Sequence, residues 1–226
     1  MTEQYLHRGD APFGDGVWER IDTAVIEAAK NRCAGRRLIH TVGPHGLGLK
    51  TLPSGDHVVD GKTVEGVAVD TGPMVPLAFI HSEFTLSIRD VAAHEQAGMP
   101  LDVKPAAKAA VAVARQEDQL VFNGLASLGT TGLLNTPGGR SIKLEPWEQV
   151  GTAAEDIIRA VNELDAAGFS GPYALALTPN LYNRLLRRYP RGNMTELEHV
   201  HQIATDGVIK VPGLPVGGVL VAKGGS

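Results

Sequence analysis

The sequence predicts a mixed fold in which helices alternate with short strands. Glycine occurs 27 times and proline 14 times, while aromatic residues make up only 5%, a composition typical of many turns and long connections. Segments with helical periodicity alternate with short runs of β-branched residues. At 226 residues the chain is long enough to bury a sizeable core, as one large domain or two closely joined ones.

Two helices are predicted in the first half of the chain. In Val17–Arg32, apolar residues recur every three or four positions, and Gly35 can end the helix. Residues 105–123 ("PAAKAAVAVARQEDQLVFN") begin with proline, are rich in Ala and Val, and stop at Asn123-Gly124. We expect this second segment to be a buried spine helix.

The spine helix carries two adjacent carboxylates, Glu117 and Asp118. Neighbouring residues of a helix point about 100° apart around the axis, so these two groups cannot converge on one substrate atom. We therefore expect scaffold residues, with Asp118 in an ion pair along the helix or to a neighbouring element.

The segment between these helices predicts a long β-hairpin arm. A β-prone run, Leu38–Val42, leads into the turn-rich residues 43–48. From residue 49 to 84, β-branched residues alternate with Gly, Asp and Pro, and Asp60-Gly61 is a candidate turn. Because this stretch has too few apolar residues to fold alone, we expect its strands to pair with a partner subunit.

The second half predicts a β-α pattern. Residues 147–167 have helical periodicity, and residues 171–178 ("GPYALALT") form a run typical of a buried strand. A shorter helix is expected at 179–189, with Thr178 as a candidate N-cap.

A further helix is expected from Thr195, because Glu198 three residues later completes the pattern of a capping box. Two short strands, 208–212 and 217–226, are expected to finish the chain. Neither an internal repeat nor a clean linker is visible in the sequence.

Composition excludes several classes of function. The net charge of −4 provides no basic field to hold nucleic acid or an anionic membrane, so neither partner is expected. No apolar run approaches the roughly 20 residues of a membrane helix. The single Cys33 and the lack of a basic-then-apolar leader pattern predict a cytoplasmic protein.

Catalytic signatures are weak. His199 and His201 are the best metal candidates, and with a neighbouring Glu they allow a metal hydrolase as an alternative. Residues two apart in a helix diverge, however, so we expect no metal site, no cofactor and no enzymatic activity. The stretches "RRLIH" and "LLRRYPR" are small basic patches that fit an anion, solvent or a neighbouring subunit.

The order of several segments resembles that of encapsulin shell proteins, a family also labelled linocin or bacteriocin. The segments are "WERID", "GRRLIHTVGPHGLG", "FTLSIRDVAAHEQAGMPLDV", "RQEDQLVFNG" with "GLLNT", "GPYALALTPNLYNRLLRRY", "ELEHVHQIATDGVIKVP" and "GGVLVAKGG". Together they span nearly the whole chain. The resemblance implies the α+β fold of HK97-type phage capsid proteins, with a peripheral domain, an axial domain and an extended β-hairpin loop.

The resemblance also implies domain boundaries. The N-terminal helix and the start of the peripheral domain occupy 1–48, and the extended loop occupies 49–90. The peripheral domain with its spine helix covers 91–149, the axial domain 150–212, and a return to the peripheral domain 213–226. Family members continue beyond this last stretch, so we expect the chain to be truncated, naturally short, or completed by a second chain.

The function implied by the resemblance is structural. About 60 or more subunits would assemble into an icosahedral container around a cargo enzyme, either a ferritin-like iron oxidase or a peroxidase, that carries a C-terminal targeting peptide. A phage-type major capsid protein is the alternative. The family pattern places cargo binding at Ala29, Arg36, Leu38 and His40, and pore lining at Arg191 and Asn193.

Overall fold

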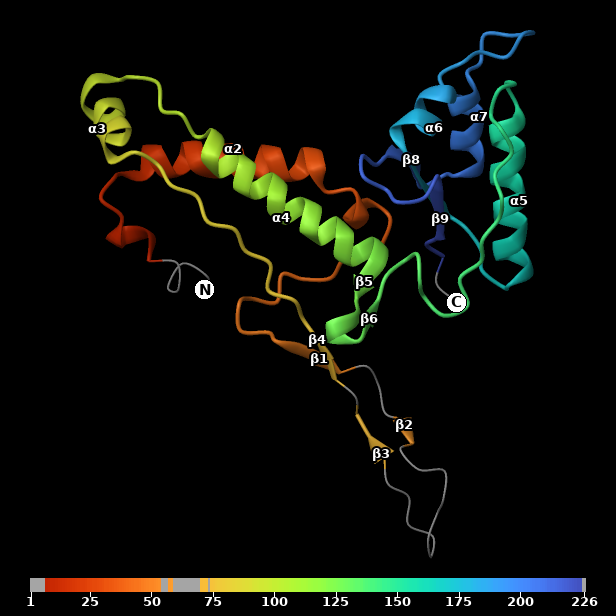
Figure 1. The fold of residues 1–226 in the computed structure, drawn as a ribbon, viewed down its shortest axis with the longest axis horizontal. Helices are drawn as coiled ribbons and strands as arrows, with labels where there is room; N and C mark the ends of the chain where they lie inside the picture. Colours follow the sequence, from red (N-terminus) through yellow and green to blue (C-terminus); the bar gives the residue numbers. More distant parts are fainter. Residues whose placement is uncertain (1–6, 54–56, 59–69, 73, 225–226) are drawn as a thin grey trace, which may run out of the picture. The chain divides into compact units, whose positions relative to one another are not determined.

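The chain divides into two compact units. The computed structural model describes residues 7–53, 57–58, 70–72 and 74–224 (Figure 1). The first unit comprises residues 1–32, 42–117 and 125–130. The second unit comprises residues 33–41, 118–124 and 131–226.

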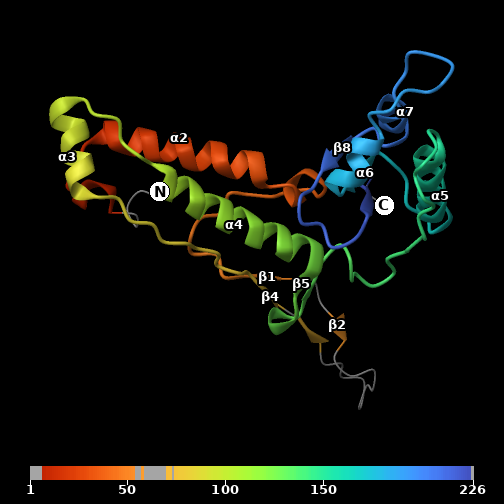
Figure 2. The same cartoon turned by 45° about the horizontal axis from the view of Figure 1, so that its top comes forward.

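The first unit is built on helices. After the 3-10 turn η1 (Arg8–Asp10) come α2 (Asp15–Arg32), α3 (Ile88–Ala97) and α4 (Lys104–Asn123), whose last residues belong to the second unit. Helices α2 and α4 lie side by side in both views (Figures 1 and 2). The two helices predicted in this half of the chain are thereby confirmed. An apolar cluster is buried between them and α3, and its members are Val17, Ile21, Val91, Leu101 and Ala106.

Helix α3 is an element that the sequence analysis missed. Ser87 caps its start by accepting a hydrogen bond from the Asp90 backbone N–H at 3.4 Å. Gly98 ends it in the left-handed conformation, with φ of 64°. The Ser87-to-Asp90 spacing and the following glycine are the signal that could have predicted this helix.

The arm is a two-stranded ribbon in its described parts (Figure 1). Strand β1 (Thr51–Pro53) pairs antiparallel with β4 (Met74–Pro76), and β2 (His57–Val58) with β3 (Asp70–Thr71). The predicted hairpin is confirmed at these pairs, while the predicted turn at Asp60-Gly61 lies outside the described residues.

The second unit is a small sheet with helices around it. Strand β7 (Tyr173–Leu177) lies in the centre, parallel to β8 (Gly207–Lys210) and antiparallel to β9 (Gly218–Ala222). The accompanying helices are α5 (Thr152–Ala166), α6 (Pro179–Arg184) and α7 (Glu196–Ile203). The capping box predicted at Thr195 and Glu198 is present.

Strand β7 is buried on both faces, which explains its uniformly apolar sequence. Leu175 and Leu177 enter one core with Trp147, Leu185 and residues of α5 and α7. The alternate residues of β7 enter a second core with Phe122, Leu38 and residues of β8; these β7 residues are Ala174 and Ala176. The period-two alternation of a strand thus joins two cores into one unit.

Short elements follow α4 in the chain, and the strand expected at the described residues 38–42 is absent. Strand β5 (Gly124–Leu125) pairs with β6 (Thr130–Thr131) around the 3-10 turn η3 (Ala126–Leu128). Residues 38–42, all within the described chain, form no strand. They follow the 3-10 turn η2 (Gly35–Arg37), and Leu38 ends that turn with helical backbone angles while its side chain lies in the core.

Two predicted helices are shorter than expected. Residues 147–151 form turns, and α5 begins only at Thr152, because Gly151 has a φ of 107° that a helix cannot accept. Helix α6 ends at Arg184 rather than near 189, and Thr178 stands at its N-cap position without a side-chain hydrogen bond.

Gly132 is required by a close backbone approach, which gives a first prediction. A Cβ there would lie 2.5 Å from the Phe122 carbonyl carbon and oxygen, and these atoms belong to backbone that cannot rotate away. We expect Gly132→Ala to lower the free energy of unfolding by about 1–3 kcal/mol in chemical denaturation. Gly48→Ala, where a Cβ meets open space, is the control, and equal effects of the two changes would contradict this reading.

Candidate assembly and cargo surfaces

Exposed apolar side chains recur along the arm, the extended segment that follows it and the first residue of α3, and we call this set the apolar stripe. Seven large apolar side chains here are exposed at more than a third of their surface, and Phe79 reaches 73%. The stripe consists of Leu52, Met74, Val75, Leu77, Phe79, Phe84 and Ile88. An exposed apolar surface of this kind marks an interaction site, since a monomer gains nothing by leaving it in water.

The turn after α2 is held rigidly by Asp118. Its carboxylate accepts hydrogen bonds from the backbone N–H groups of Ala34 and Gly35, at 2.9 and 2.8 Å. The Asp118 carboxylate therefore caps a turn, and within the described part of the chain it makes no ion pair of the kind expected. Lys223 adds a second tie by donating to the Arg37 carbonyl oxygen at 2.8 Å.

The four residues expected to bind cargo have different environments. Ala29 is half-buried on α2 in the first unit, whereas the other three follow one another in the second unit. Arg36 and His40 are exposed, but Leu38 has 0% exposure and lies in the core around β7. A peptide could reach Leu38 only if this core opened.

A shallow hollow of about 280 Å³ in the second unit adjoins this turn. Ile39 contributes one wall and Val121 and Leu133 contribute others; the remaining lining residues are Leu120, Thr131, Gly132 and Thr136. The sequence analysis missed this hollow, because its walls come from three separate segments. The two consecutive apolar residues Leu38 and Ile39 were the only local signal in the sequence.

Residues 188–195, here called the basic loop, project beyond α6 and α7 in both views (Figures 1 and 2). An antiparallel bridge between Arg188 and Thr195 closes its base, and the Tyr189 N–H donates to the Met194 carbonyl oxygen at 3.1 Å. The predicted pore-lining residues, Arg191 and Asn193, are both exposed on this loop.

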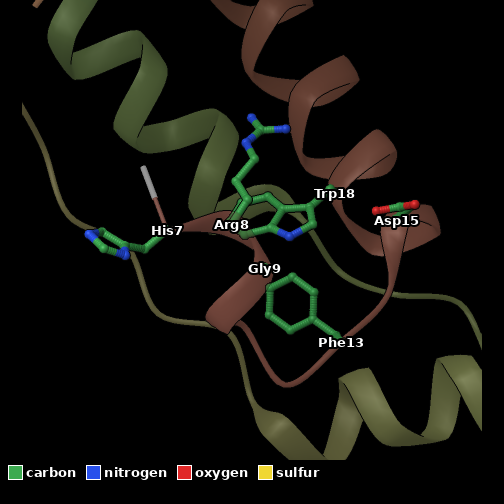
Figure 3. Close-up of a pocket in the computed structure, with 6 residues that line it drawn as sticks. All are labelled: His7, Arg8, Gly9, Phe13, Asp15 and Trp18. Atoms are coloured by element: carbon green, nitrogen blue, oxygen red, sulfur yellow. The ribbon is translucent and has the colours of Figure 1, made fainter. Parts of the chain in front are cut away.

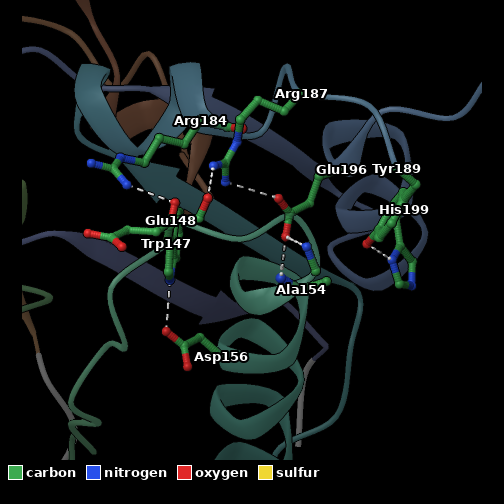
Figure 4. Close-up of polar contacts among 10 residues, drawn as sticks. Trp147, Glu148, Ala154, Asp156, Arg184, Arg187, Tyr189, Glu196 and His199 are labelled. Carbon is green, nitrogen blue, oxygen red and sulfur yellow. Dashed lines mark hydrogen bonds and ion pairs between the residues drawn. The ribbon is translucent and has the colours of Figure 1, made fainter. Parts of the chain in front are cut away.

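A buried carboxylate anchors the basic loop to the start of α5 (Figure 4). Glu196, with 0% exposure, accepts hydrogen bonds from the Gly151 N–H at 2.8 Å and the Ala154 N–H at 3.2 Å. Its other oxygen lies 3.6 Å from the guanidinium of Arg187. Glu196 thereby supplies the helix cap that Gly151, which has no side chain, cannot provide.

A second buried carboxylate, Asp156, fixes the turns before α5. It accepts hydrogen bonds from the Trp147 indole N–H and the Glu145 backbone N–H, both at 2.8 Å, and from Arg159. Burial by itself raises the pKa of Asp156, but these hydrogen bonds outweigh burial and hold the pKa below its ordinary value of 3.8.

This lowered pKa predicts a loss of stability in acid. A carboxyl with a lower pKa in the folded state adds stability above its unfolded pKa, and that stability disappears as the pH falls below about 4. We expect Asp156→Asn to be less stable than the unmodified protein at pH 7 and to lose less on acidification. Unfolding midpoints measured across pH 2–7 test this; parallel pH curves for the two proteins would show that Asp156 contributes nothing to the acid response.

The histidine pair does not gather ligands. His199 and His201 lie on helix α7, where residues two apart diverge, and the His199 Nδ1 is 2.7 Å from the Tyr189 hydroxyl. Among the described residues, no group of three or more His, Cys, Asp and Glu side chains is placed to hold a metal ion. No described helix has the length and apolar character needed to cross a membrane.

A cavity of about 560 Å³ lies at the start of α2 in the first unit (Figure 3). Its lining includes Trp18 and Phe13, whose rings stand 5.1 Å apart, and the Arg8 guanidinium lies 4.7 Å from the Trp18 ring. Arg8 also makes two hydrogen bonds of 2.7 Å to Asp22. These contacts fasten the N-terminal segment to α2.

The two-stranded arm, the exposed stripe and the sheet with its helices define a class of protein, the subunit of a capsid-like shell. A solved virus-like particle from Pyrococcus furiosus shares this fold with a TM-score of 0.63 at 22% identity, over 88% of this chain and 75% of that one. The α+β, HK97-type fold inferred from the sequence is thereby confirmed.

The family follows from the sequence comparisons. The profile of a family described as "Encapsulating protein for peroxidase" matches residues 3–226. The type 1 encapsulin shell protein EncA of Myxococcus xanthus is 34% identical over 90% of this chain and 74% of its own length. A diheme-cytochrome-encapsulin shell fusion protein of Kuenenia stuttgartiensis is 32% identical over 84% of this chain, and the match spans 55% of that relative's length. The chain belongs to the encapsulin family of shell proteins.

Proposed function

We propose that the chain assembles with about 60 or more copies of itself into a closed icosahedral compartment in the cytoplasm, and that this compartment encloses a cargo enzyme. The apolar stripe carries this proposal. Its seven side chains each leave more than a third of their surface exposed in the subunit, and a neighbouring copy of the chain would cover that surface.

The arm supports the same reading through its backbone. Each described strand of the arm has a single partner, so the outer edges of the ribbon carry unpaired N–H and C=O groups. A two-stranded ribbon is marginally stable alone in water. Pairing of the arm with neighbouring subunits would satisfy these groups and bury the stripe in one step.

For cargo recognition we propose the turn after α2 and the hollow beside it. A targeting peptide would place apolar side chains in the hollow against Ile39 and Val121. The exposed Arg36 and His40, which flank Ile39 in the sequence, would fix its register. Ala29 stays a separate candidate contact on α2. In this scheme Leu38 supports the turn from within the core.

The remaining assignments follow from a container role. We propose that residues 49–90 act as the extended loop, that residues 150–212 form the axial domain, and that the basic loop borders an opening of the shell with Arg191 and Asn193 at its rim. The chain itself then needs no catalytic group and no cofactor, and the chemistry belongs to the cargo.

The mass of the freshly purified particle tests the proposal. For 60 copies of a 23.9 kDa chain, light scattering should give about 1.4 MDa, and larger shells give more. Negative-stain images should show hollow spheres that contain protein. A homogeneous monomer or dimer would contradict the proposal, and spheres filled with nucleic acid would favour a phage-type capsid protein instead.

A further inference from the structure

The basic loop presents its charge from a rigid base. Besides the bridge at Arg188 and Thr195, the Glu196 N–H donates to the Arg187 carbonyl oxygen at 2.9 Å. The Tyr189 hydroxyl contacts His199 of α7 at 2.7 Å. These contacts fix the direction of the loop, so the charged side chains at its tip are held at a defined place.

The arginines around the loop divide into two sets. Arg184 and Arg187 turn inward and donate to the carbonyl oxygens of Trp147 and Glu148, each at 2.7 Å (Figure 4). Arg188 and Arg191 are exposed instead, and among the described residues neither guanidinium group makes a hydrogen bond or an ion pair of 4 Å or less. Two guanidinium groups on one eight-residue loop therefore face solvent.

One nearby carboxylate, Glu198, offsets part of these charges, because hydrogen bonds from Thr195 and the charge of Arg188 together lower the pKa of Glu198. The loop contains no Asp or Glu. Glu196 is buried at the α5 cap. Glu198 is engaged by Thr195, whose N–H and hydroxyl donate to it at 2.6 and 2.8 Å. Arg191 has no carboxylate partner among the described residues, so the exposed tip stays positive although the chain as a whole carries a net charge of −4.

We propose that the basic loop makes the shell selective for small anions, an inference that rests on the proposed function placing this loop at an opening. Shell symmetry repeats the loop around that opening, and every copy adds its exposed guanidinium groups, whose field extends over a screening length of about 8 Å at physiological salt. Phosphates and small carboxylates enter readily there, while metal cations are repelled. The compartment therefore suits a cargo enzyme that acts on anionic or neutral molecules.

Entry of ions into the shell tests this selectivity. Shells are reassembled around a dextran too large to escape, which carries one dye quenched by iodide and one quenched by thallium(I). Stopped-flow quenching then gives the entry rate of each ion. We expect iodide to enter on the order of 10-fold faster than thallium(I) at low ionic strength, with the difference fading at 1 M salt as screening shortens to about 3 Å.

The variant Arg188→Gln with Arg191→Gln should bring the two entry rates together. The control is Arg140→Gln. Arg140 is another exposed arginine of the second unit but lies outside the basic loop, so its replacement removes one positive charge and should leave the ratio unchanged. Equal rates of the two ions in the unmodified shell, or a ratio that survives the double substitution, would overturn the inference. Light scattering on each sample separates these results from a failure to form shells, which would overturn the proposed function itself.

Discussion

Replacing Phe79 with aspartate is expected to abolish shell assembly while leaving the subunit folded. Phe79 is the most exposed large apolar side chain of the stripe, at 73%, so its removal costs the isolated subunit little. In a shell the same side chain would be buried against a neighbour. A carboxylate there would then lie desolvated without a partner, at every copy of the interface.

The measurement is analytical ultracentrifugation of the purified variant. Megadalton particles should be replaced by species of subunit size, with the far-UV circular dichroism of the subunit unchanged. Phe79→Leu keeps an apolar side chain and should still assemble. If Phe79→Asp forms particles as readily as the unmodified chain, the stripe is not an assembly surface at this position.

Replacing Glu196 with alanine is expected to be the most destabilising single change in the second unit. The N–H groups of Gly151 and Ala154 lose their acceptor, and the guanidinium of Arg187 loses its ion-pair partner. Because Glu196 has 0% exposure, water cannot replace the carboxylate without opening the core. Loss of one partner from a buried charged network costs about 3–5 kcal/mol.

Thermal unfolding at one fixed protein concentration measures this cost, since assembly makes the midpoint concentration-dependent. A loss of this size corresponds to a fall of roughly 10 °C or more for a chain of this length. Glu198→Ala is a matched control, because it removes an exposed carboxylate from the same helix and should have a small effect. Equal midpoints for the two variants would show that Glu196 does not anchor α5.

The contrast between Glu196 and Glu198 shows what local patterns predict. The capping box of Glu198 depends on Thr195, three residues away, and was visible in the sequence. Glu196 caps a helix that begins 44 residues earlier, at Thr152. No spacing rule links these positions, because β7 and α6 lie between them and only folding brings them together.

The arm and the turn after α2 show the same division. The sparse apolar content of residues 49–84 predicted an arm that needs a partner, and the described strand pairs are antiparallel as expected. The β-prone run at Leu38–Val42 predicted a strand wrongly. A long-range contact decided the outcome, since the Asp118 carboxylate captures the backbone at Ala34 and Gly35 and leaves Leu38 facing the core.

The sequence by itself determined the elements whose signals are local: the long helices, the buried strand β7, the arm and the order of segments that marks the family. The tertiary structure alone decided which of the arginines face solvent, which carboxylates are buried as anchors, and which side chains of the stripe and the hollow remain uncovered. The physical reason is the distance along the chain over which each interaction acts. Helix periodicity and capping act within a few residues, whereas burial and charge pairing depend on segments that are distant in the chain and adjacent only in the fold.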